Sequence, residues 1–321
     1  YQNLPELFKT NSGTSTGFDQ TQVYPDFEPA HSNNTCAFVT ITRGCDNYCS
    51  YCIVPFVRGR ERSVPFESIY KEVENCGRQG LKDVTLLGQN VNSYSYKGMN
   101  FPRLLRELNQ IESIYRLRFL TSHPKDLSDE LIQTMADCDK ICHHIHLPMQ
   151  SGDNHILRSM NRKYSYDSYY NLTEKLRITM PDIGLTTDLI AGFPSETEAM
   201  FEHTLDAMKS IRFDYAFCFK YSEREGTPAS GWPDQVPEEI RLERLQRMID
   251  LQREITLEKF SARIGRFVEI YVENLSKKSR RQVSGKTDDF KIAVMTGDES
   301  DIGKLKRSKV VDATAGTLIC E

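Results

Sequence analysis

From residue 36 onward, short apolar runs alternate along the chain with longer segments whose apolar residues recur every three or four positions. The short runs predict buried strands, and the longer segments predict amphipathic helices. We expect strands near residues 36–42, 82–87, 115–120, 141–147, 184–190 and 214–220. We expect helices near residues 66–79, 101–110, 127–137, 165–179 and 196–210, and a long helix near 237–263.

This alternation is typical of βαβ units and a parallel sheet. Six units predict an α/β fold, an incomplete TIM-like (β/α)6 barrel spanning residues 36–261. The catalytic groups of such barrels lie on loops after the carboxyl ends of the strands. The expected strands are followed by polar loops with Gly, Pro or clustered Cys, which begin at Thr42, Leu87, Thr121, Leu147, Ala191 and Tyr221. We therefore expect an active-site mouth on this rim.

The two ends of the chain have a different character. Residues 1–35 hold a short apolar segment and then a Ser/Thr/Gly/Asn/Gln-rich stretch, too polar to bury a core, which predicts a linker from a preceding domain. In residues 262–321 the helical period stops, and alternating runs at 267–272, 291–295 and 309–314 are separated by Gly and Asp turns. This pattern predicts a second, small all-β barrel.

Charge and cysteine usage restrict the class of protein. The 321 residues contain 41 Lys+Arg against 45 Asp+Glu, a net charge of −4, which does not suggest a general nucleic-acid coat protein. Three of the nine cysteines are clustered, and we find no signal peptide, so a reducing cytoplasm is the expected location. No stretch approaches the roughly 18 apolar residues of a membrane span, so no membrane is expected as a partner.

Cys45, Cys49 and Cys52 lie within eight residues of one loop. Three thiolates at this spacing indicate a ligand set, and three rather than four is the informative number. A structural zinc site normally has four protein ligands, whereas an iron–sulfur cubane on three cysteines keeps one iron open. The alternatives are three reduced cysteines without a metal, or a zinc site completed by a distant His.

Residues 276–281 gather the positive charges of Lys277, Lys278, Arg280 and Arg281 in what we expect to be a turn. Residues 261–321 as a whole carry 12 Lys+Arg against 9 Asp+Glu. A run of charge is often only a solvated loop. On a small β-barrel attached to an enzyme, clustered Lys and Arg also favour contacts with RNA phosphates.

Four stretches together, residues 45–63, 86–94, 146–152 and 192–196, resemble the radical S-adenosylmethionine (radical SAM) methylthiotransferase family. The resemblance covers roughly residues 1–321. It implies a radical-SAM barrel, and it implies that residues 262–321 correspond to the family's TRAM domain, an RNA-binding module.

The resemblance implies an iron–sulfur enzyme of tRNA modification. A 4Fe–4S cluster on the three cysteines would bind S-adenosyl-L-methionine at its open iron, and its reduction would give a 5′-deoxyadenosyl radical. The radical would abstract hydrogen from carbon 2 of N6-dimethylallyladenosine next to the anticodon. A second 4Fe–4S cluster, expected on the missing N-terminal domain, would deliver the sulfur. The implied partners are a tRNA anticodon stem-loop and a low-potential electron donor, and a monomer is expected.

Further site residues are weaker expectations. Tyr51 would pack near the adenine of the cosubstrate or in the core, and Gln89 would face its methionine amine. Gln150 and Ser151 would reach the ribose, Arg162 would pair with the carboxylate or stay solvated, and Asp188 inside the barrel would need a partner or a ligand hydroxyl. The residues expected to hold RNA phosphates near the target base are Arg58, Arg60 and Arg62. Beyond the cluster and cosubstrate, no catalytic residue is expected.

Other assignments stay open. His123 and His146 are expected to be structural hydrogen-bonding residues, and Cys138 and Cys142 to be packing residues despite a spacing that would suit a metal. A sister methylthiotransferase, acting on threonylcarbamoyl-adenosine in tRNA or on a ribosomal protein, is the alternative enzyme. A non-catalytic RNA-binding protein with a structural metal is the distant alternative.

Overall fold

The computed structural model describes residue 9, residues 35–277 and residues 279–321. The expected linker therefore lies outside the described residues, apart from Lys9 and Thr35. In the described residues, no helix has the length and apolar character needed to cross a membrane.

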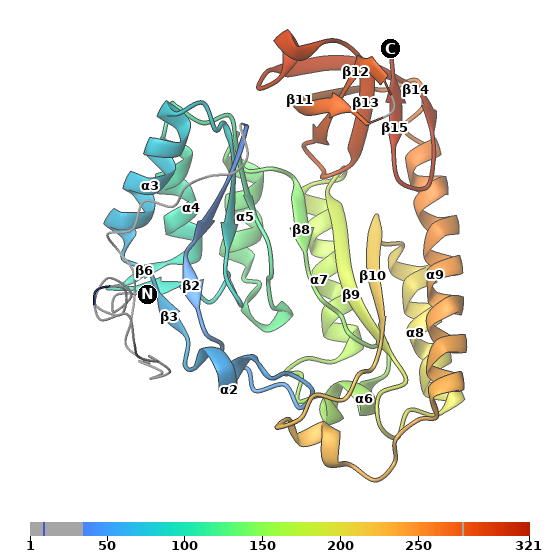
Figure 1. The fold of residues 1–321 in the computed structure, drawn as a ribbon. Coiled ribbons are helices and arrows are strands. Elements are labelled where there is room, and N and C mark those ends of the chain that lie inside the picture. Colours follow the sequence, from blue (N-terminus) through green and yellow to red (C-terminus); the bar gives the residue numbers. More distant parts are fainter. Residues whose placement is uncertain (1–8, 10–34, 278) are drawn as a thin grey trace.

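Six parallel strands form the centre of the molecule, and they follow one another in chain order. The first three, β1 (Cys36–Thr40), β4 (Asp83–Leu87) and β7 (Arg116–Phe119), make one sheet, and β8 (His144–His146), β9 (Gly184–Ala191) and β10 (Tyr215–Lys220) make a second. A parallel bridge between Leu117 and Ile141 connects the two sheets. The predicted open (β/α)6 barrel is confirmed (Figure 1).

Helices follow the strands and cover the outer face of the barrel. They are α3 (Phe66–Arg78), α4 (Phe101–Asn109), α5 (Asp129–Asp137), α7 (Tyr166–Thr179) and α8 (Glu198–Ile211), and the long α9 (Glu238–Ser261) comes after β10. Alternate strand residues, such as Val39 and Leu189, are fully buried in the core beneath the helices. The intervening residues, such as Arg118 and Asp188, belong to the inner face, because successive strand side chains point to opposite faces.

Several short elements were not predicted because they are too short to show a period. They are helices α2 (Val54–Arg58) and α6 (Asn154–Ser159), strands β2 (Thr42–Arg43), β3 (Arg62–Ser63), β5 (Ser95–Tyr96) and β6 (Met99–Asn100), and 3-10 turns η1 (Pro124–Asp126), η2 (Pro228–Gly231) and η3 (Glu299–Asp301). Both α2 and α6 lie at the end of the barrel that carries the cysteine loop (Figure 1).

The C-terminal residues form the expected small closed barrel. Its strands are β11 (Phe267–Ser276), β12 (Ser279–Thr287), β13 (Ile292–Thr296), β14 (Leu305–Ala313) and β15 (Leu318–Cys320), paired in the order β11-β12-β13-β15-β14. The charged turn expected over residues 276–281 is confirmed only in part: Lys277 lies in the turn between β11 and β12, whereas β12 begins at Ser279 and includes the backbone of Arg280 and Arg281. The mostly polar sequence of β12 does not indicate a strand. Only one face of this strand is buried, and Val283 on that face is fully buried.

The small barrel lies against the amino-terminal ends of the parallel strands, at the opposite end from α2 and α6 (Figure 1). Arg116 Nη1 donates to Lys286 O (2.6 Å), and Arg118 Nη2 donates to Thr287 O (2.8 Å). The ring of Phe290 stacks on His144 with centroids 4.4 Å apart. The hairpin between β12 and β13 therefore closes this end of the (β/α)6 barrel.

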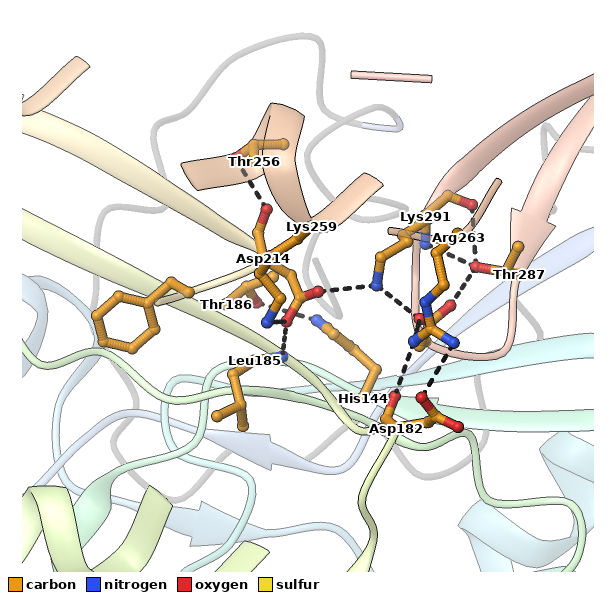
Figure 2. A network of polar contacts seen from close by, with 12 residues as sticks. His144, Asp182, Leu185, Thr186, Asp214, Thr256, Lys259, Arg263, Thr287 and Lys291 are labelled. Carbon is orange, nitrogen blue, oxygen red and sulfur yellow. Dashed lines mark hydrogen bonds and ion pairs between the residues drawn. The ribbon is translucent and has the colours of Figure 1, made fainter. Parts of the chain in front are cut away.

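An ion network ties the two barrels together (Figure 2). Lys291, which is only 2 % exposed, reaches Asp214 (2.8 Å) and Asp289 (2.6 Å). Lys259 of α9 reaches Asp214 from the other side (2.7 Å), and Arg263 pairs with Asp289 (2.8 Å). Side chains from three parts of the chain thus share one buried site, which fixes how the small barrel sits on the larger one.

Candidate functional site

The cysteine loop begins after strand β2 and is folded back on itself by main-chain hydrogen bonds. Cys52 N donates to Cys49 O (3.0 Å), and Cys45 N donates to Gly59 O (3.2 Å). Cys49 is buried, whereas Cys45 and Cys52 are half-buried. The loop thus presents its three thiols from a fixed backbone at the carboxyl end of the first strand.

The end of helix α6 holds the same loop from the other side of the barrel. Ser50 N donates to Met160 O (3.1 Å), and the Ser50 hydroxyl donates to Ser159 O (2.8 Å). Asn161 Nδ2 donates to Tyr48 O (2.8 Å). Tyr48 and Asn161 both have left-handed backbone angles, φ 47° and φ 59°. Such conformations cost free energy and persist where the surroundings impose them, often at functional sites.

Gln89 fixes the start of the loop. Its Oε1 accepts a hydrogen bond from Gly44 N at 2.7 Å. Gly44 has φ 75°, and a Cβ there would lie 2.1 Å from Arg60 O, so only glycine fits this turn. The contact of Gln89 with the methionine amine remains a prediction, and the structure gives this side chain a role in holding the cysteine loop.

We expect Gln89→Leu to lower the occupancy of whatever metal group the three cysteines hold. The substitution removes the acceptor of the Gly44 amide, and losing a group that orients metal ligands typically costs about 10–100-fold in metal affinity. Iron and acid-labile sulfide per chain, measured during titration with a chelator, give the readout. Gln133→Leu, on the exposed face of α5, is the control. Equal chelator resistance in both variants would contradict this role.

Arg162 lies directly behind the loop and is 8 % exposed. Its Nη1 donates to Cys49 Sγ (3.5 Å), its Nε to the Tyr164 hydroxyl (2.8 Å) and its Nη2 to Pro148 O (3.0 Å). Desolvation by burial alone would lower the pKa of Arg162, but the surrounding Tyr164, Tyr51 and Cys49 groups raise it. The expected pairing of Arg162 with a methionine carboxylate stays a prediction.

The thiols are close enough to influence one another. Burial raises the pKa of Cys45 and of Cys52, and Cys49 raises each of them further. Within residues 35–277 and 279–321, no three Cys, His, Asp or Glu side chains are arranged to hold a single metal ion. The cysteines of a cubane bind different irons, so their sulfur atoms need not converge on one point. A cationic metal group would favour the thiolates that burial disfavours.

Several buried polar atoms at the same rim have no hydrogen-bond partner in the described part of the chain. They are Oε1 of Gln150 in the loop after β8, Oγ of Ser122 after β7, Oδ1 of Asn90 after β4, and the hydroxyl of Tyr221 directly after β10. A buried polar group without a partner costs about 1–3 kcal/mol, so each such atom needs an explanation. Their common position at the carboxyl ends of the strands fits a polar ligand bound there.

Ser151 differs from its neighbour Gln150. It is fully buried, and its hydroxyl lies 3.4 Å from the Thr204 hydroxyl and accepts from Asp153 N (3.1 Å). The structure therefore gives the Ser151 hydroxyl internal partners, and its contact with a ribose remains a prediction.

Tyr51 belongs to a small apolar cluster under the mouth. Its ring meets the edge of Phe193 at 6.4 Å, and Phe193 also packs on Tyr221 and Trp232. This arrangement fits both of the expected roles of Tyr51, a core aromatic and a neighbour of a bound adenine.

The loop that carries Phe193 is locked by a buried ion pair. Glu196 Oε2 accepts from Gly192 N (2.7 Å) and from Arg244 Nη1 (2.9 Å). Burial raises the pKa of Glu196 to about 7, opposed by these two donors. The Glu196 carboxylate therefore stabilises the conformation of its own loop.

Asp188 has a partner inside the barrel. His146 Nε2 lies 3.4 Å from Asp188 Oδ1, and His146 Nδ1 lies 3.1 Å from the Thr186 hydroxyl. His123, which was expected to be a structural hydrogen-bonding residue, accepts a hydrogen bond at Nδ1 from Lys125 N (3.2 Å). Burial, with the charges of Arg162 and Lys125, lowers the pKa of His123 to about 2, so its ring is neutral.

The three arginines after the loop differ in their surroundings. Arg58 is exposed at the end of α2, Arg60 pairs with Asp46 (2.8 Å), and Arg62 Nη2 donates to Arg58 O (3.1 Å). Beside them, Phe56 is also exposed on α2.

The basic residues of the small barrel are distant from that rim. Lys277 and Arg281 are exposed, whereas Lys278 and the side chain of Arg280 lie outside the described residues.

Cys138 and Cys142 are buried, in agreement with packing roles.

Sequence reasoning missed Asn90, Ser122 and Tyr221 as site residues. Asn90 lies within the motif of residues 86–94, and Ser122 and Tyr221 each follow an expected strand. Their position after strand ends was the feature of the sequence that could have indicated them as site residues. Only the structure shows that their polar atoms are buried without partners.

Comparisons with known proteins agree with this geometry. Residues 39–208 match the Radical SAM superfamily. The chain is 47% identical over 303 residues to the tRNA-2-methylthio-N(6)-dimethylallyladenosine synthase of Thermoanaerobacter sp. (strain X514), covering 94% of this chain and 64% of that protein. It is 46% identical over 320 residues to the synthase of the same name from Moorella thermoacetica (strain ATCC 39073 / JCM 9320), covering 97% and 72%.

Solved structures show the same fold. The radical S-adenosylmethionine methyltransferase TsrM from Kitasatospora setae matches with a TM-score of 0.53 at 18% identity, covering 61% of this chain and 38% of that one. Coproporphyrinogen III oxidase (HemN) from Escherichia coli also has a TM-score of 0.53, at 14% identity, covering 72% and 54%. The chain spans about 64% of the length of the Thermoanaerobacter relative. It belongs to the radical SAM superfamily and, within it, to the family of the tRNA-2-methylthio-N(6)-dimethylallyladenosine synthases.

Proposed function

We propose that this chain is the radical SAM and RNA-binding part of an enzyme that methylthiolates carbon 2 of N6-dimethylallyladenosine next to the anticodon of tRNA. The observation that carries the proposal is a three-cysteine loop on the rim of an open (β/α)6 barrel, in a chain 43–50% identical to relatives named for this reaction. Membership of the superfamily implies a 4Fe–4S cluster and S-adenosylmethionine as cofactors.

The residues present fit these cofactors. Cys45, Cys49 and Cys52 would hold the cluster, and the unpartnered Gln150 Oε1 and Ser122 Oγ would hydrogen-bond the cosubstrate. When bound, the two groups supply one-electron cleavage of the cosubstrate and a radical for hydrogen abstraction.

The protein's own part is to hold and shield these groups. Gln89 and helix α6 fix the cysteine loop, and the Tyr51–Phe193 cluster keeps one side of the mouth apolar. A water-poor wall protects a reactive intermediate from side reactions. Asp188 and His146, on the inner face, are available to orient the base that enters the barrel.

Access for tRNA follows from the position of the two barrels. The target base must be splayed out of its loop into the mouth, where exposed Phe56 and Arg58 offer stacking and charge. The small barrel, which we propose to be a TRAM domain over residues 262–321, lies at the other end of the strands. Strand β9 alone has 8 residues, or about 26 Å at about 3.3 Å per residue. An RNA that touches both ends must therefore extend over at least about this distance.

We further propose that sulfur comes from a second 4Fe–4S cluster on an N-terminal domain that precedes this chain in the longer protein. The expected linker over residues 1–35 would join it to residues 36–261. The electron comes from a low-potential donor, and the protein works in the cytoplasm as a monomer.

Neutralising the basic end of the small barrel is expected to weaken tRNA binding. Replacing Lys277, Lys278, Arg280 and Arg281 by Gln removes up to four phosphate contacts, and each contact contributes about 0.7–0.9 to the slope of log K against log salt. Filter binding of the anticodon stem-loop at several salt concentrations measures the slope. A control variant, Lys209→Gln, removes an exposed charge on α8. An unchanged slope would exclude the four residues from the interface.

Two assays separate this function from the alternatives. Mass spectrometry of digested tRNA from cells that express the chain extended to the length of its relatives should show 2-methylthio-N6-dimethylallyladenosine. A methylthiolated threonylcarbamoyl-adenosine, or a modified ribosomal protein instead, would identify the sister enzyme. Zinc without acid-labile sulfide in the purified chain would favour the non-catalytic RNA-binding protein.

A further inference from the structure

Arg162 brings a positive charge into the wall of the cysteine loop, where it is almost fully buried. Its three hydrogen-bond acceptors are the Tyr164 hydroxyl, the Pro148 carbonyl and the Cys49 sulfur. In the described part of the chain, no carboxylate forms an ion pair with it. A buried charge without a counter-charge is strongly unfavourable, so this cation indicates that an anion belongs beside it.

The geometry identifies which group is that anion. Two of the three nitrogens of the guanidinium donate to neutral oxygens, and these bonds fix the plane of the fork. The third, Nη1, lies 3.5 Å from Cys49 Sγ. Tyr164 supports the same orientation, because the guanidinium carbon lies 5.0 Å from the centre of its ring. Arg162 is thus held with one N–H aimed at a cysteine that becomes a thiolate when it binds metal.

We propose that Arg162 raises the reduction potential of the cluster on Cys45, Cys49 and Cys52 by donating a charge-assisted N–H···S hydrogen bond to Cys49 Sγ. The inference rests on the proposed function, since it requires that these cysteines hold a 4Fe–4S cluster. Reduction transfers one electron from the low-potential donor to the cluster, which becomes one unit more negative. A fixed positive charge and a hydrogen bond at a ligand sulfur stabilise the reduced form more than the oxidised form.

This role makes Arg162 a positioning residue that sets how readily the cluster accepts an electron. A lysine would keep the charge but would lose the fork that bonds Tyr164, Pro148 and Cys49 at once. If Arg162 instead binds the methionine carboxylate, its loss would weaken cosubstrate binding and leave the potential of the cosubstrate-free cluster unchanged. The two roles are therefore separable by measurement.

The test is a redox titration of the anaerobically reconstituted protein, followed by the electron paramagnetic resonance signal of the reduced cluster. It uses the wild type, Arg162→Gln, Arg162→Lys and the control Arg158→Gln, without S-adenosylmethionine or tRNA. Arg158→Gln changes the net charge by the same amount as Arg162→Gln. Because Arg158 is exposed at the end of α6, this control removes no buried cation. In Arg162→Gln, the ratio of reduced to oxidised cluster at a fixed potential should fall at least tenfold, a shift of about 59 mV to more negative values. Arg162→Lys should lie between this value and the wild type, and Arg158→Gln should match the wild type.

A wild-type potential in Arg162→Gln with full iron and sulfide content would overturn the proposal. So would an unchanged potential combined with a tenfold or greater loss of S-adenosylmethionine affinity, which would assign Arg162 to the carboxylate. If Arg162→Gln takes up no cluster, Arg162→Lys decides: a threefold lower ratio supports the proposal, and an unchanged ratio overturns it. Failure of the wild type to modify tRNA would leave this result intact, whereas a wild type that binds zinc and no sulfide would contradict the proposed function itself.

Discussion

Replacing Cys49 by alanine is expected to abolish cosubstrate cleavage, with 5′-deoxyadenosine formation falling at least about a hundredfold. The thiolate is the metal ligand, and changes in groups that only orient ligands already cost 10–100-fold. Cys49 is also the buried member of the three and the one bonded to Arg162. The readouts are iron and sulfide per chain, and 5′-deoxyadenosine from S-adenosylmethionine with a strong reductant. Cys45→Ala and Cys52→Ala should behave in the same way.

Cys218→Ala is the matched control for this prediction. Cys218 lies in the middle of β10 and packs on the core, outside the cysteine loop. Its variant should keep the cluster and the cleavage activity. Cleavage that survives in Cys49→Ala, or that is lost equally in Cys218→Ala, would contradict the assignment of the cluster to the three-cysteine loop.

Lys291→Met should destabilise the folded protein by about 3–5 kcal/mol, the typical cost of removing one partner from a buried ion pair. Asp214 pairs with Lys291 and Lys259, Asp289 pairs with Lys291 and Arg263, and the exposed Asp182 pairs with Arg263 and Arg266. Loss of Lys291 removes one of the two cationic partners from each of the buried carboxylates, Asp214 and Asp289. Urea denaturation of the variant and the wild type measures the difference in free energy of unfolding.

Two further variants show whether charge balance is the cause. In Lys291→Met with Asp214→Asn, one of the two carboxylates that lose the Lys291 charge is also neutral, so the double variant should recover part of the loss. Lys306→Met removes a more exposed partner of Asp301 and should cost less than about 1 kcal/mol. A double variant as unstable as the sum of its two single variants would contradict the network account.

The same site gives a pH dependence. Burial alone would raise the pKa of Asp214, but the charges of Lys291 and Lys259 lower it from 3.8 to about 2. A carboxyl group whose pKa is lowered by folding stabilises the protein above its unfolded pKa, and this contribution is lost as the pH falls toward the folded value. The free energy of unfolding should therefore fall between about pH 5 and pH 2, and less steeply in Asp214→Asn. Parallel profiles for the two proteins would contradict this.

The long elements could be predicted from sequence because their periods are strong. All six parallel strands and six long helices lie where the apolar pattern indicates them, since each helix must bury one stripe and each strand at least one face. The first residues of β12, residues 279–281, were assigned to the preceding turn because their charged side chains obscure the alternation of a strand. The contact between the two barrels was not predictable, because Lys291 and Asp214 are 77 residues apart and look like ordinary surface charges in the sequence.

For the site, the sequence predicts which cysteines are ligands, and the structure shows which contacts hold their loop. Cys45, Cys49 and Cys52 are recognisable from spacing alone. The hydrogen bond from Gly44 N to Gln89 is not, because it depends on how two loops from different strands meet. Arg162 was expected to pair with a methionine carboxylate or to stay solvated, and only the structure shows that it is buried with its Nη1 at the sulfur of Cys49.

The most direct test of the central claim is anaerobic reconstitution of this chain with S-adenosylmethionine, a reductant and a prenylated anticodon stem-loop, with 5′-deoxyadenosine and methylthiolated adenosine measured by mass spectrometry. The same assay is run on the chain extended to the length of its relatives. We expect 5′-deoxyadenosine from both proteins and methylthiolated product only from the longer one. No cosubstrate cleavage by either protein, with the cluster intact, would contradict the radical site described here.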